Sequence, residues 1–235
     1  MKGSLWRWFV IYKSHIEYLE YQTNPIVGCS GKGCAVVKVC WAAKQARRQI
    51  PRLDKSGRER GCDLCYRFVP HVHWERFDDF LSVKKPSRIG VSFMGEFYDD
   101  EIDNWVRFDY YIHMFKAPQH TFIILTKQPQ NITEESLPDN LWVGVSINRK
   151  EDLWRLDALR AVHARLRIAS FEPLYEDLGE VNLEKFGWII IGSQTRPDLQ
   201  PKPEWVYSLS HQASELGIPV FWKNNLKETA ESIGY

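Results

Sequence analysis

Short apolar runs, rich in β-branched residues, alternate along the chain with amphipathic stretches. Nearly continuous apolar runs are typical of strands covered on both faces. Such runs predict strands at residues 88–93, 121–126, 141–147, 166–171, 188–192 and 220–223, and a more extended segment predicts a first strand at 20–27. The amphipathic stretches predict helices at residues 41–49, 101–116, 150–163 and 203–216.

This alternation of β and α elements predicts an α/β fold with a parallel sheet, either doubly wound or closed as a barrel. We expect a partial or near-complete parallel (β/α) TIM-like barrel of about six to seven strands. No G-x-G-x-x-G motif follows the first strand, which disfavours dinucleotide binding. Since α/β barrels of 235 residues fold as one unit, we expect a single domain over residues 1–235, with a cysteine-containing insertion at about 50–86.

The composition excludes several classes of protein. With 44% hydrophobic and 26% charged residues, the chain can bury a core and is not of the disordered class. No apolar run approaches the ~18 residues of a membrane span. The first twenty residues contain no A-x-A-like cleavage site, so we expect a cytoplasmic protein with no membrane partner.

All five cysteines lie in one part of the chain, between Cys29 and Cys65. Their odd number disfavours a closed disulfide framework, and clustered thiols more often converge on a metal ion or an iron–sulfur cluster. Cys62-x2-Cys65 has the knuckle spacing of zinc or iron–sulfur ligation, and His71 and His73 follow it. A Cys2His2-like site is therefore one possibility, and histidines that only hydrogen-bond to the backbone of the insertion are the other.

Polar residues follow the predicted strands at their carboxyl ends, where βα loops carry the chemistry of barrels. They are Glu96, Thr126, Lys127, Ser146, Asn148, Glu172, Ser193, Gln194, Lys223 and Asn224. The cysteine-rich region follows the first strand, so we expect it at the same edge of the sheet. Any one of these residues alone could be a helix cap or a loop hydrogen-bonding group.

The span from Lys44 to Arg67, which includes the start of the insertion, is also locally basic. Its basic residues, opposed by three acidic ones, are Lys44, Arg47, Arg48, Arg52, Lys55, Arg58, Arg60 and Arg67. This excess of positive charge could meet the phosphates of a nucleic acid or a nucleotide. A solvated helix face is the alternative, and the acidic run from Glu96 to Asp103 opposes indiscriminate binding of nucleic acid.

Several motifs resemble, in order, those of a phage-associated radical-SAM-like barrel family. They are NPIVGC, GC, CWA, PHVHWERFDDFLSVKKPSRIGVSFMGEF, APQHTFIILTKQPQN, LWVGVSIN, ASFEPL, WIIIGSQTRP and PVFWKNNL. The resemblance runs from about Asn24 to Lys223. It implies a barrel of the radical-SAM type and an enzyme that binds a 4Fe–4S cluster. Such an enzyme takes an electron from an external donor and reductively cleaves S-adenosylmethionine to a 5′-deoxyadenosyl radical, here with an unknown substrate.

The resemblance also implies the cluster ligands. Radical-SAM enzymes hold the cluster with three thiolates in the loop after the first strand, and the open fourth iron binds S-adenosylmethionine. Here that loop carries Cys29-x4-Cys34-x5-Cys40, followed by Trp41, and both gaps are longer than in the usual C-x3-C-x2-C motif. Cys62 and Cys65 would form a second metal site, of zinc or iron–sulfur type; in a rival assignment one of them completes the principal cluster.

The resemblance further implies the contacts of S-adenosylmethionine. Met94-Gly95-Glu96 matches, in shortened form, the Gly-Gly-Glu-like turn that holds the methionyl amino group, so Gly95 and Glu96 are expected there. Ser146, Asn148 and Glu172 are expected near the carboxylate and the ribose hydroxyls. The turn that contains Ser193 is expected near the adenine.

Two other functions stay open from the sequence. One is a zinc-stabilised β/α barrel hydrolase whose thiolates are purely structural. The other is a non-catalytic, metal-stapled binding module that acts with a partner protein encoded nearby.

Overall fold

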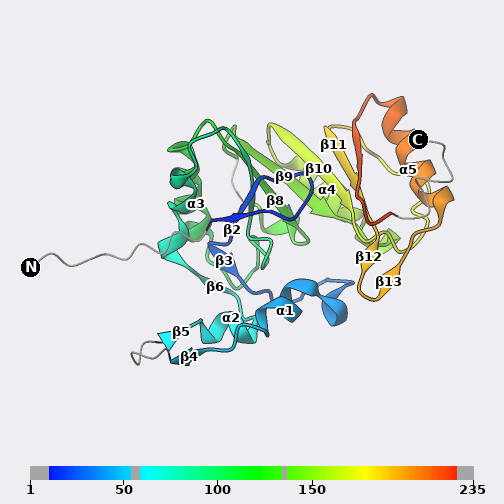
Figure 1. Ribbon diagram of the computed structural model, residues 1–235. Helices are drawn as coiled ribbons and strands as arrows, with labels where there is room; N and C mark the ends of the chain where they lie inside the picture. Colours follow the sequence, from blue (N-terminus) through cyan, green and yellow to red (C-terminus); the bar gives the residue numbers. More distant parts are fainter. Residues whose placement is uncertain (1–10, 54–58, 134–136, 227–235) are drawn as a thin grey trace, which may run out of the picture.

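The computed structural model describes residues 11–53, 59–133 and 137–226. Its centre is an eight-stranded sheet (Figure 1). The strands, in their order across the sheet, are β1 (Tyr12–Lys13), β2 (Tyr21–Thr23), β7 (Arg88–Val91), β8 (Thr121–Thr126), β9 (Leu141–Ser146), β10 (Leu166–Phe171), β11 (Trp188–Ile191) and β14 (Val220–Trp222). All neighbours pair in parallel except β1, which is antiparallel to β2. The predicted α/β class with a largely parallel sheet is confirmed.

The six later strands form where the apolar runs predict them, but the expected first strand at 20–27 is wrong in extent. It divides into β2, within the sheet, and β3 (Ile26–Val27), which pairs antiparallel with β6 (His71–Val72). Asn24 and Pro25 separate the two parts, and proline has no N–H with which to continue a ladder. The chain therefore leaves the sheet just before the first cysteine.

The helices are shorter than the amphipathic pattern predicts. They are α1 (Trp41–Ala46), α3 (Asn104–Phe115), α4 (Trp154–Ala161) and α5 (Pro203–Glu215). The helix expected at 150–163 begins instead with a 3-10 turn, η5 (Lys150–Asp152). The carboxylate of Asp152 accepts the N–H groups of Asn148 and Arg149, which closes this tight turn before α4 starts.

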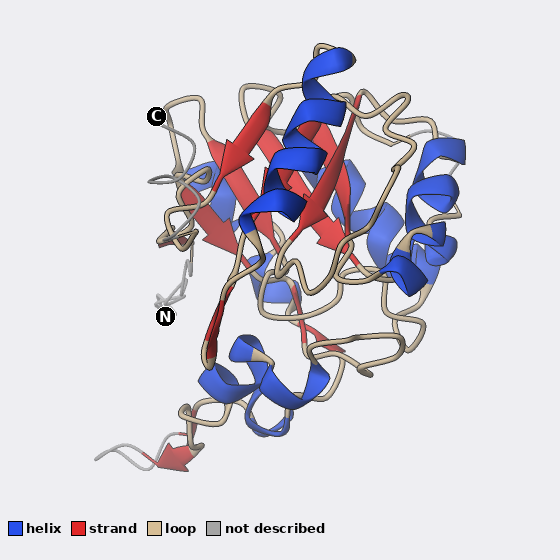
Figure 2. Ribbon diagram, turned by 90° about the vertical axis from the view of Figure 1, so that its right-hand side faces the viewer, coloured by secondary structure: helices blue, strands red, loops and turns tan. Residues whose placement is uncertain are grey.

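The two faces of the sheet bury different partners. One face, with Ile89, Phe122 and Val145, packs against Tyr110 of α3, Leu159 of α4 and their neighbours on α5 in the main core. Helices of this length are marginal alone, so this burial holds them in place. Each fully buried aliphatic or aromatic side chain contributes about 1.5–3 kcal/mol. Figure 2 shows these helices against the strands.

The opposite face carries a smaller core around Ile123, Ile168 and Ile190. The turn before β2 covers it, and the Tyr18 ring lies edge-on to Trp188 with a centroid distance of 5.4 Å. Within the described part of the chain β1 and β14 are the two edges, so the sheet is open and is not closed as a barrel.

The first part of the insertion at 50–86 lies below the sheet in Figure 1, whereas Phe77 and Phe80 of its later part pack in the main core. It contains β4 (Arg52–Leu53), β5 (Glu59–Arg60), α2 (Asp63–Arg67), β6, η2 (Trp74–Arg76) and η3 (Asp79–Ser82), preceded in the chain by η1 (Val37–Val39) and α1. Residues 1–10 and 54–58 lie outside the described residues. The first ten are half of the N-terminal segment that contains no A-x-A-like cleavage site. Among the described helices, none is long and apolar enough to cross a membrane.

One buried ion anchors the insertion to the sheet. The Thr23 hydroxyl, at the end of β2, donates to both oxygens of the Asp79 carboxylate, at 2.9 and 3.0 Å, and Asp79 is wholly buried. Burial raises the pKa of Asp79 from its ordinary value of 3.8 to about 6, against the opposing effects of the Thr23 hydroxyl and the Arg76 charge.

We expect this carboxyl to make stability depend on pH. The folded chain binds the Asp79 proton more readily than the unfolded chain, so this group's stabilisation is lost as the pH rises from about 4 to 6. Asp79→Asn keeps an acceptor for Thr23 and buries no charge. Its free energy of unfolding, relative to wild type, should therefore rise by up to about 3 kcal/mol between pH 4 and 7.

Urea denaturation across this pH range measures the difference. Asp139→Asn, at an exposed position, is the matched control and should follow the wild-type profile. A constant difference between Asp79→Asn and wild type at all pH values would contradict the assignment.

Candidate functional site

The cysteine loop, residues 28–40, is fastened to the carboxyl edge of the sheet by main-chain hydrogen bonds. The Gly28 N–H donates to the Met94 carbonyl (3.1 Å), and the Glu96 N–H donates to the Gly28 carbonyl (3.0 Å). Together these bonds pair Gly28 with Gly95 in a short parallel bridge. Since the Met94–Glu96 turn follows β7, the loop that carries the first three cysteines lies directly against Gly95 and Glu96.

Glycine is required on both sides of this contact. Gly28 has a φ of +87°, and a Cβ there would lie 2.1 Å from the Val69 carbonyl oxygen. A Cβ at Gly95 would lie 2.6 Å from the Gly28 oxygen. The insertion, the cysteine loop and the turn after β7 therefore meet with their backbones in contact.

The three loop cysteines are partly buried, free thiols. Burial, together with the negative charges of Glu96, Asp99 and Cys34, raises the pKa of Cys29 to about 12, against the opposing effect of a hydrogen bond from the Gly31 N–H. A cationic centre beside such a thiol would favour its ionised form. Cys40 lies at the start of α1, and its sulfur accepts the Ala43 N–H at 3.5 Å.

A buried arginine ties the middle of the loop to the sheet. Arg155 of α4 is 1% exposed, and its two terminal nitrogens donate to the Ser146 carbonyl (2.7 Å) and the Gly33 carbonyl (2.5 Å). The Asp152 carboxylate, 2.7 Å from Arg155, compensates its charge. This bridge places Gly33 and Cys34 next to the end of β9.

Glu96 is buried and already engaged by the protein. It is 5% exposed, and burial raises its pKa while its hydrogen bonds and the Lys127 charge lower it. Oε1 accepts the Thr126 hydroxyl (2.6 Å) and the Tyr98 N–H (3.1 Å), and Oε2 accepts the Lys127 N–H (2.9 Å). One lone pair of Oε2 is left for another donor.

The other expected contacts of S-adenosylmethionine lie at the ends of β9, β10 and β11. Asn148 is fully buried: its side-chain N–H donates to the Pro173 carbonyl (2.8 Å), while its Oδ1 has no partner. Glu172 forms an ion pair with Lys223. The Ser193 hydroxyl donates to the Asn225 carbonyl (2.6 Å). Each of these residues therefore has a structural contact, and Asn148 also offers a free acceptor.

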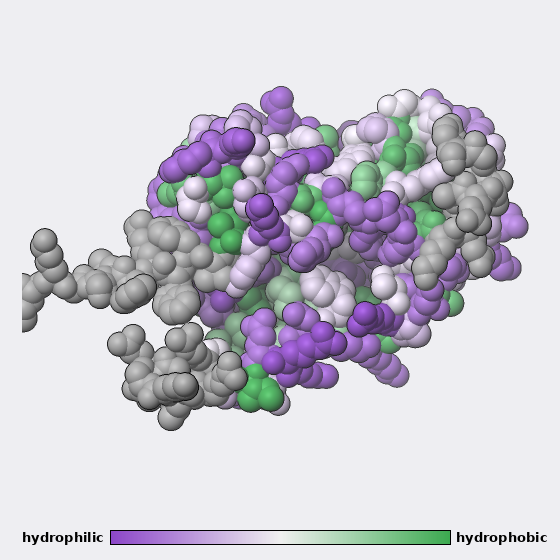
Figure 3. Space-filling model, viewed as in Figure 1, coloured by the Kyte–Doolittle hydropathy of each residue, from purple (hydrophilic) through white to green (hydrophobic). Residues whose placement is uncertain are grey.

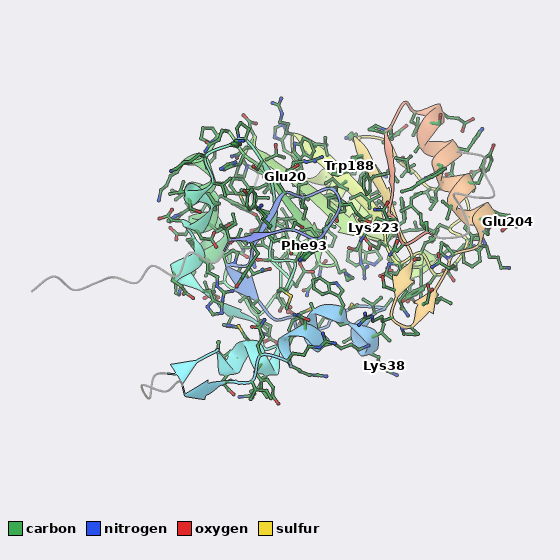
Figure 4. The ribbon with its side chains drawn as sticks, in the orientation of Figure 1. Glu20, Lys38, Phe93, Trp188, Glu204 and Lys223 are labelled. Carbon is green, nitrogen blue, oxygen red and sulfur yellow. The ribbon has the colours of Figure 1, made fainter. Side chains whose placement is uncertain are left out.

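The cysteine loop and the strand ends enclose a cleft of about 380 Å³. It is lined by Ala35, Lys38, Val39, Arg149, Tyr175, Glu176, Gln194 and Leu199. Figure 3 shows the surface hollowed between the insertion side and the sheet. In Figure 4, Lys38 lies below the hollow, on the cysteine-bearing segment, and Lys223 lies above it. A larger cavity of about 600 Å³ opens at the start of α3, and no cysteine lines it.

The second pair of cysteines gathers with the two histidines. In the described residues, Cys62, Cys65, His71 and His73 are the one group of at least three such ligands placed to hold an ion, with ligand atoms within 4.8 Å of one another. Cys65 Sγ lies 3.3 Å from His71 Nε2 and 3.1 Å from His73 Nε2. This Cys2His2 group could hold a metal, and it favours a separate site over the rival in which Cys62 or Cys65 completes the principal cluster.

The local fold explains why these four side chains meet. Cys62 caps α2, and its sulfur accepts the Cys65 N–H at 3.5 Å, the arrangement of a metal knuckle. Phe68, with a left-handed φ of 59°, ends α2 and turns the chain into β6. His71 lies in β6, and His73 follows this strand directly; the Nε2 atoms of the two histidines lie 2.9 Å apart.

The basic residues of the insertion are only partly described. Lys44, Arg47, Arg48 and Arg67 are exposed. Lys55 and Arg58 lie outside the described residues, and Arg52 and Arg60 are described only in their backbone. Arg67 is within 3.5 Å of Asp63, which is typical of a solvated helix face.

Comparison with known proteins places the chain in a family. The family model described as "Protein of unknown function (DUF5131)" matches residues 13–231. The chain belongs to this family. No curated protein and no solved structure matches the chain. The match spans every element of the DUF5131 chain described above except the start of β1.

Sequence reasoning missed several residues that build the site of this DUF5131 chain. The amphipathic pattern of residues 150–163 predicts that Arg155 is exposed, and nothing in the sequence indicates its contact with Gly33. Asp99 is one of a run of acids, yet it is fully buried and accepts the Ser30 N–H of the cysteine loop at 2.8 Å. Tyr175 lines the cleft and donates to Gln194, and only its position after Glu172 hints at this role.

The geometry of Glu96 predicts a stability effect. Glu96→Gln leaves one acceptor oxygen and an NH2 group that must face the Thr126 hydroxyl or the Lys127 N–H. We expect a loss of about 1–3 kcal/mol in the free energy of unfolding. Thermal denaturation measures it, with exposed Glu101→Gln as the matched control. If both variants have the melting temperature of the wild type, Glu96 does not stabilise the turn.

Proposed function

We propose that this protein is a radical S-adenosylmethionine enzyme, with its sheet a partial barrel of that type. The observation that supports this most directly is the bridge between Gly28 and Gly95, because it joins a three-cysteine loop to the turn expected to hold the methionyl group. Both lie at the carboxyl edge of a parallel sheet, where βα folds place their chemistry. We also propose that the protein is phage-associated, as the family resemblance implies.

The donor set of the loop, the three thiols of Cys29, Cys34 and Cys40, has the chemistry that a 4Fe–4S cluster needs. Cys34 lies near enough to Cys29 to raise the pKa of the Cys29 thiol, and both belong to a loop held at the sheet edge by Met94, Glu96 and Arg155. Thiolates that hold a cubane cluster each bind a different iron, so they need not converge as the ligands of one ion do. When bound, the reduced cluster supplies the electron that cleaves the C5′–S bond of S-adenosylmethionine, giving methionine and a 5′-deoxyadenosyl radical.

The chain's own residues would then bind and orient the nucleotide. The unpartnered Oδ1 of Asn148 is a buried acceptor suited to a ribose hydroxyl. The free lone pair of Glu96 Oε2 is suited to the methionyl ammonium. Arg155 holds the Gly33 carbonyl and so maintains the distance between the loop and the end of β9.

The cleft beside the loop is the proposed substrate entrance. Lys38 and Arg149 line it together with Tyr175, and the Arg149 guanidinium lies 5.7 Å from the Tyr175 ring centroid. Cations beside an aromatic ring suit a phosphate-bearing, planar substrate such as a nucleotide or a nucleic acid. An external one-electron donor is the other partner that this function requires.

We expect the anaerobically purified chain to contain about four irons and four sulfides. Replacing Cys29, Cys34 and Cys40 together by Ala should remove the iron, because no thiolate is left in the loop. Iron and acid-labile sulfide analysis measures this, and Val37→Ala, exposed in the same loop, is the control. Iron retained by the triple variant would contradict the ligand assignment; an iron-free wild type would favour the metal-stapled alternatives.

Activity gives a second test. With a chemical reductant and S-adenosylmethionine, the wild-type protein should release 5′-deoxyadenosine and methionine in equal amounts, since one bond is broken per turnover. Without substrate, the radical takes its hydrogen atom from the reductant or the buffer. Cys34→Ala should release neither. Mass spectrometry of the products measures both, and equal release from wild type and Cys34→Ala would show that the cleavage does not need this loop.

A further inference from the structure

The Cys62, Cys65, His71 and His73 cluster contains nitrogen lone pairs that face one another. His71 Nδ1 lies 2.8 Å from the Val69 carbonyl oxygen, which only accepts, so Nδ1 carries the proton. His73 Nδ1 lies 2.7 Å from the Glu75 carboxylate, which fixes the same tautomer. Both Nε2 atoms therefore point lone pairs into the cluster, 2.9 Å apart and beside two sulfurs.

Lone pairs and sulfurs at such distances repel one another unless a cation lies among them. With Zn–S of about 2.3 Å and Zn–N of about 2.0–2.1 Å, a tetrahedral ion sets its ligand atoms roughly 3.3–3.8 Å apart. The sulfur-to-nitrogen distances here are 3.1, 3.3 and 3.5 Å. The cluster is therefore close to the geometry of a tetrahedral S2N2 site.

The arrangement also distinguishes one ion from a binuclear cluster. In a [2Fe–2S] centre with two cysteines and two histidines, the sulfur pair and the nitrogen pair bind different irons. Here Cys65 Sγ is in contact distance of both histidine nitrogens, so the four ligands surround one point. Two thiolates and two imidazoles around one ion suit zinc, and four protein ligands close the site to substrate.

Main-chain contacts connect this site to the first loop cysteine, Cys29. His71 pairs with Val27 across β3 and β6. The Phe68 carbonyl, three residues after Cys65, accepts the Cys29 N–H at 3.3 Å. The Val69 carbonyl packs against Gly28 so closely that no Cβ fits between them.

We propose that Cys62, Cys65, His71 and His73 bind one structural zinc ion, and that this ion positions the Gly28–Cys29 backbone. The zinc site does not depend on the proposed function. The functional role of positioning Cys29 rests on the proposed function, because Cys29 is a ligand of the proposed cluster. Zinc fixes Cys65 to the two histidines, and so fixes the Phe68–His71 segment against which the cysteine loop is held.

The test uses the full chain. Zinc analysis of wild type should give about one ion per chain, and cobalt-grown protein should show the visible bands of a tetrahedral thiolate site. Cys62→Ser should lose the zinc, whereas the matched Cys40→Ser should keep it. Hydrogen exchange at the Cys29 amide should be at least about tenfold faster in Cys62→Ser than in Cys40→Ser.

Glu75→Gln provides a variant that keeps all four ligands and is expected to fold. It weakens the partner of His73 Nδ1, so zinc affinity in competition with a chromogenic chelator should fall roughly 10–100-fold. Exposed Glu204→Gln is the control and should match wild type. Glu75→Gln with wild-type affinity would contradict the assigned role of His73.

The two proposals fail in different ways. Wild type without zinc, or zinc retained in Cys62→Ser, overturns the zinc site. Zinc lost without faster exchange at Cys29 overturns the positioning role alone. Zinc present in a chain that never takes up iron supports the zinc site and contradicts the radical enzyme.

Discussion

The site depends on one backbone contact: the Gly28 peptide lies between the Val69 carbonyl on one side and Gly95 on the other, with no room for a side chain. The insertion, the cysteine loop and the carboxyl edge of the sheet all meet there. Hydrogen bonds of this kind contribute about 0.5–1.5 kcal/mol each, so the three between Gly28–Cys29 and its neighbours form a modest clasp. The zinc ion proposed at Cys62, Cys65, His71 and His73 would add to the stability of this contact from the side of the insertion.

Buried polar groups extend the same constraint along the loop. The Asp99 carboxylate, after β7, accepts the Ser30 N–H, and Arg155 of α4, after β9, donates to the Gly33 carbonyl. Because a buried charge is costly without partners, these groups keep their contacts and leave little freedom to the loop between them. These contacts hold the loop beside the cleft, which Lys38 lines.

The strands of the sheet could be predicted because runs such as residues 122–125 are apolar on both faces and of strand length, a pattern typical of covered parallel strands. Pro25 is a local signal for the break after β2, because proline cannot continue a ladder. The pairing of β3 with β6 has no such signal, since β6 lies far along the chain. The Cys62–Cys65 knuckle follows from spacing, but the approach of His71 and His73 needs the left-handed turn at Phe68. The contact of Arg155 with Gly33 has no local signal, because Gly33 lies on a loop distant in the sequence.

In the proposed enzyme, the cysteine loop holds a cluster whose open iron binds S-adenosylmethionine against the Gly95–Glu96 turn. Electron–nuclear double resonance on the reduced protein, with S-adenosylmethionine carrying ¹⁵N in its amino group and ¹⁷O in its carboxylate, measures this binding. Hyperfine coupling of both labels to the cluster is expected in wild type. A cluster signal with no coupling to either label would show that S-adenosylmethionine does not bind the cluster.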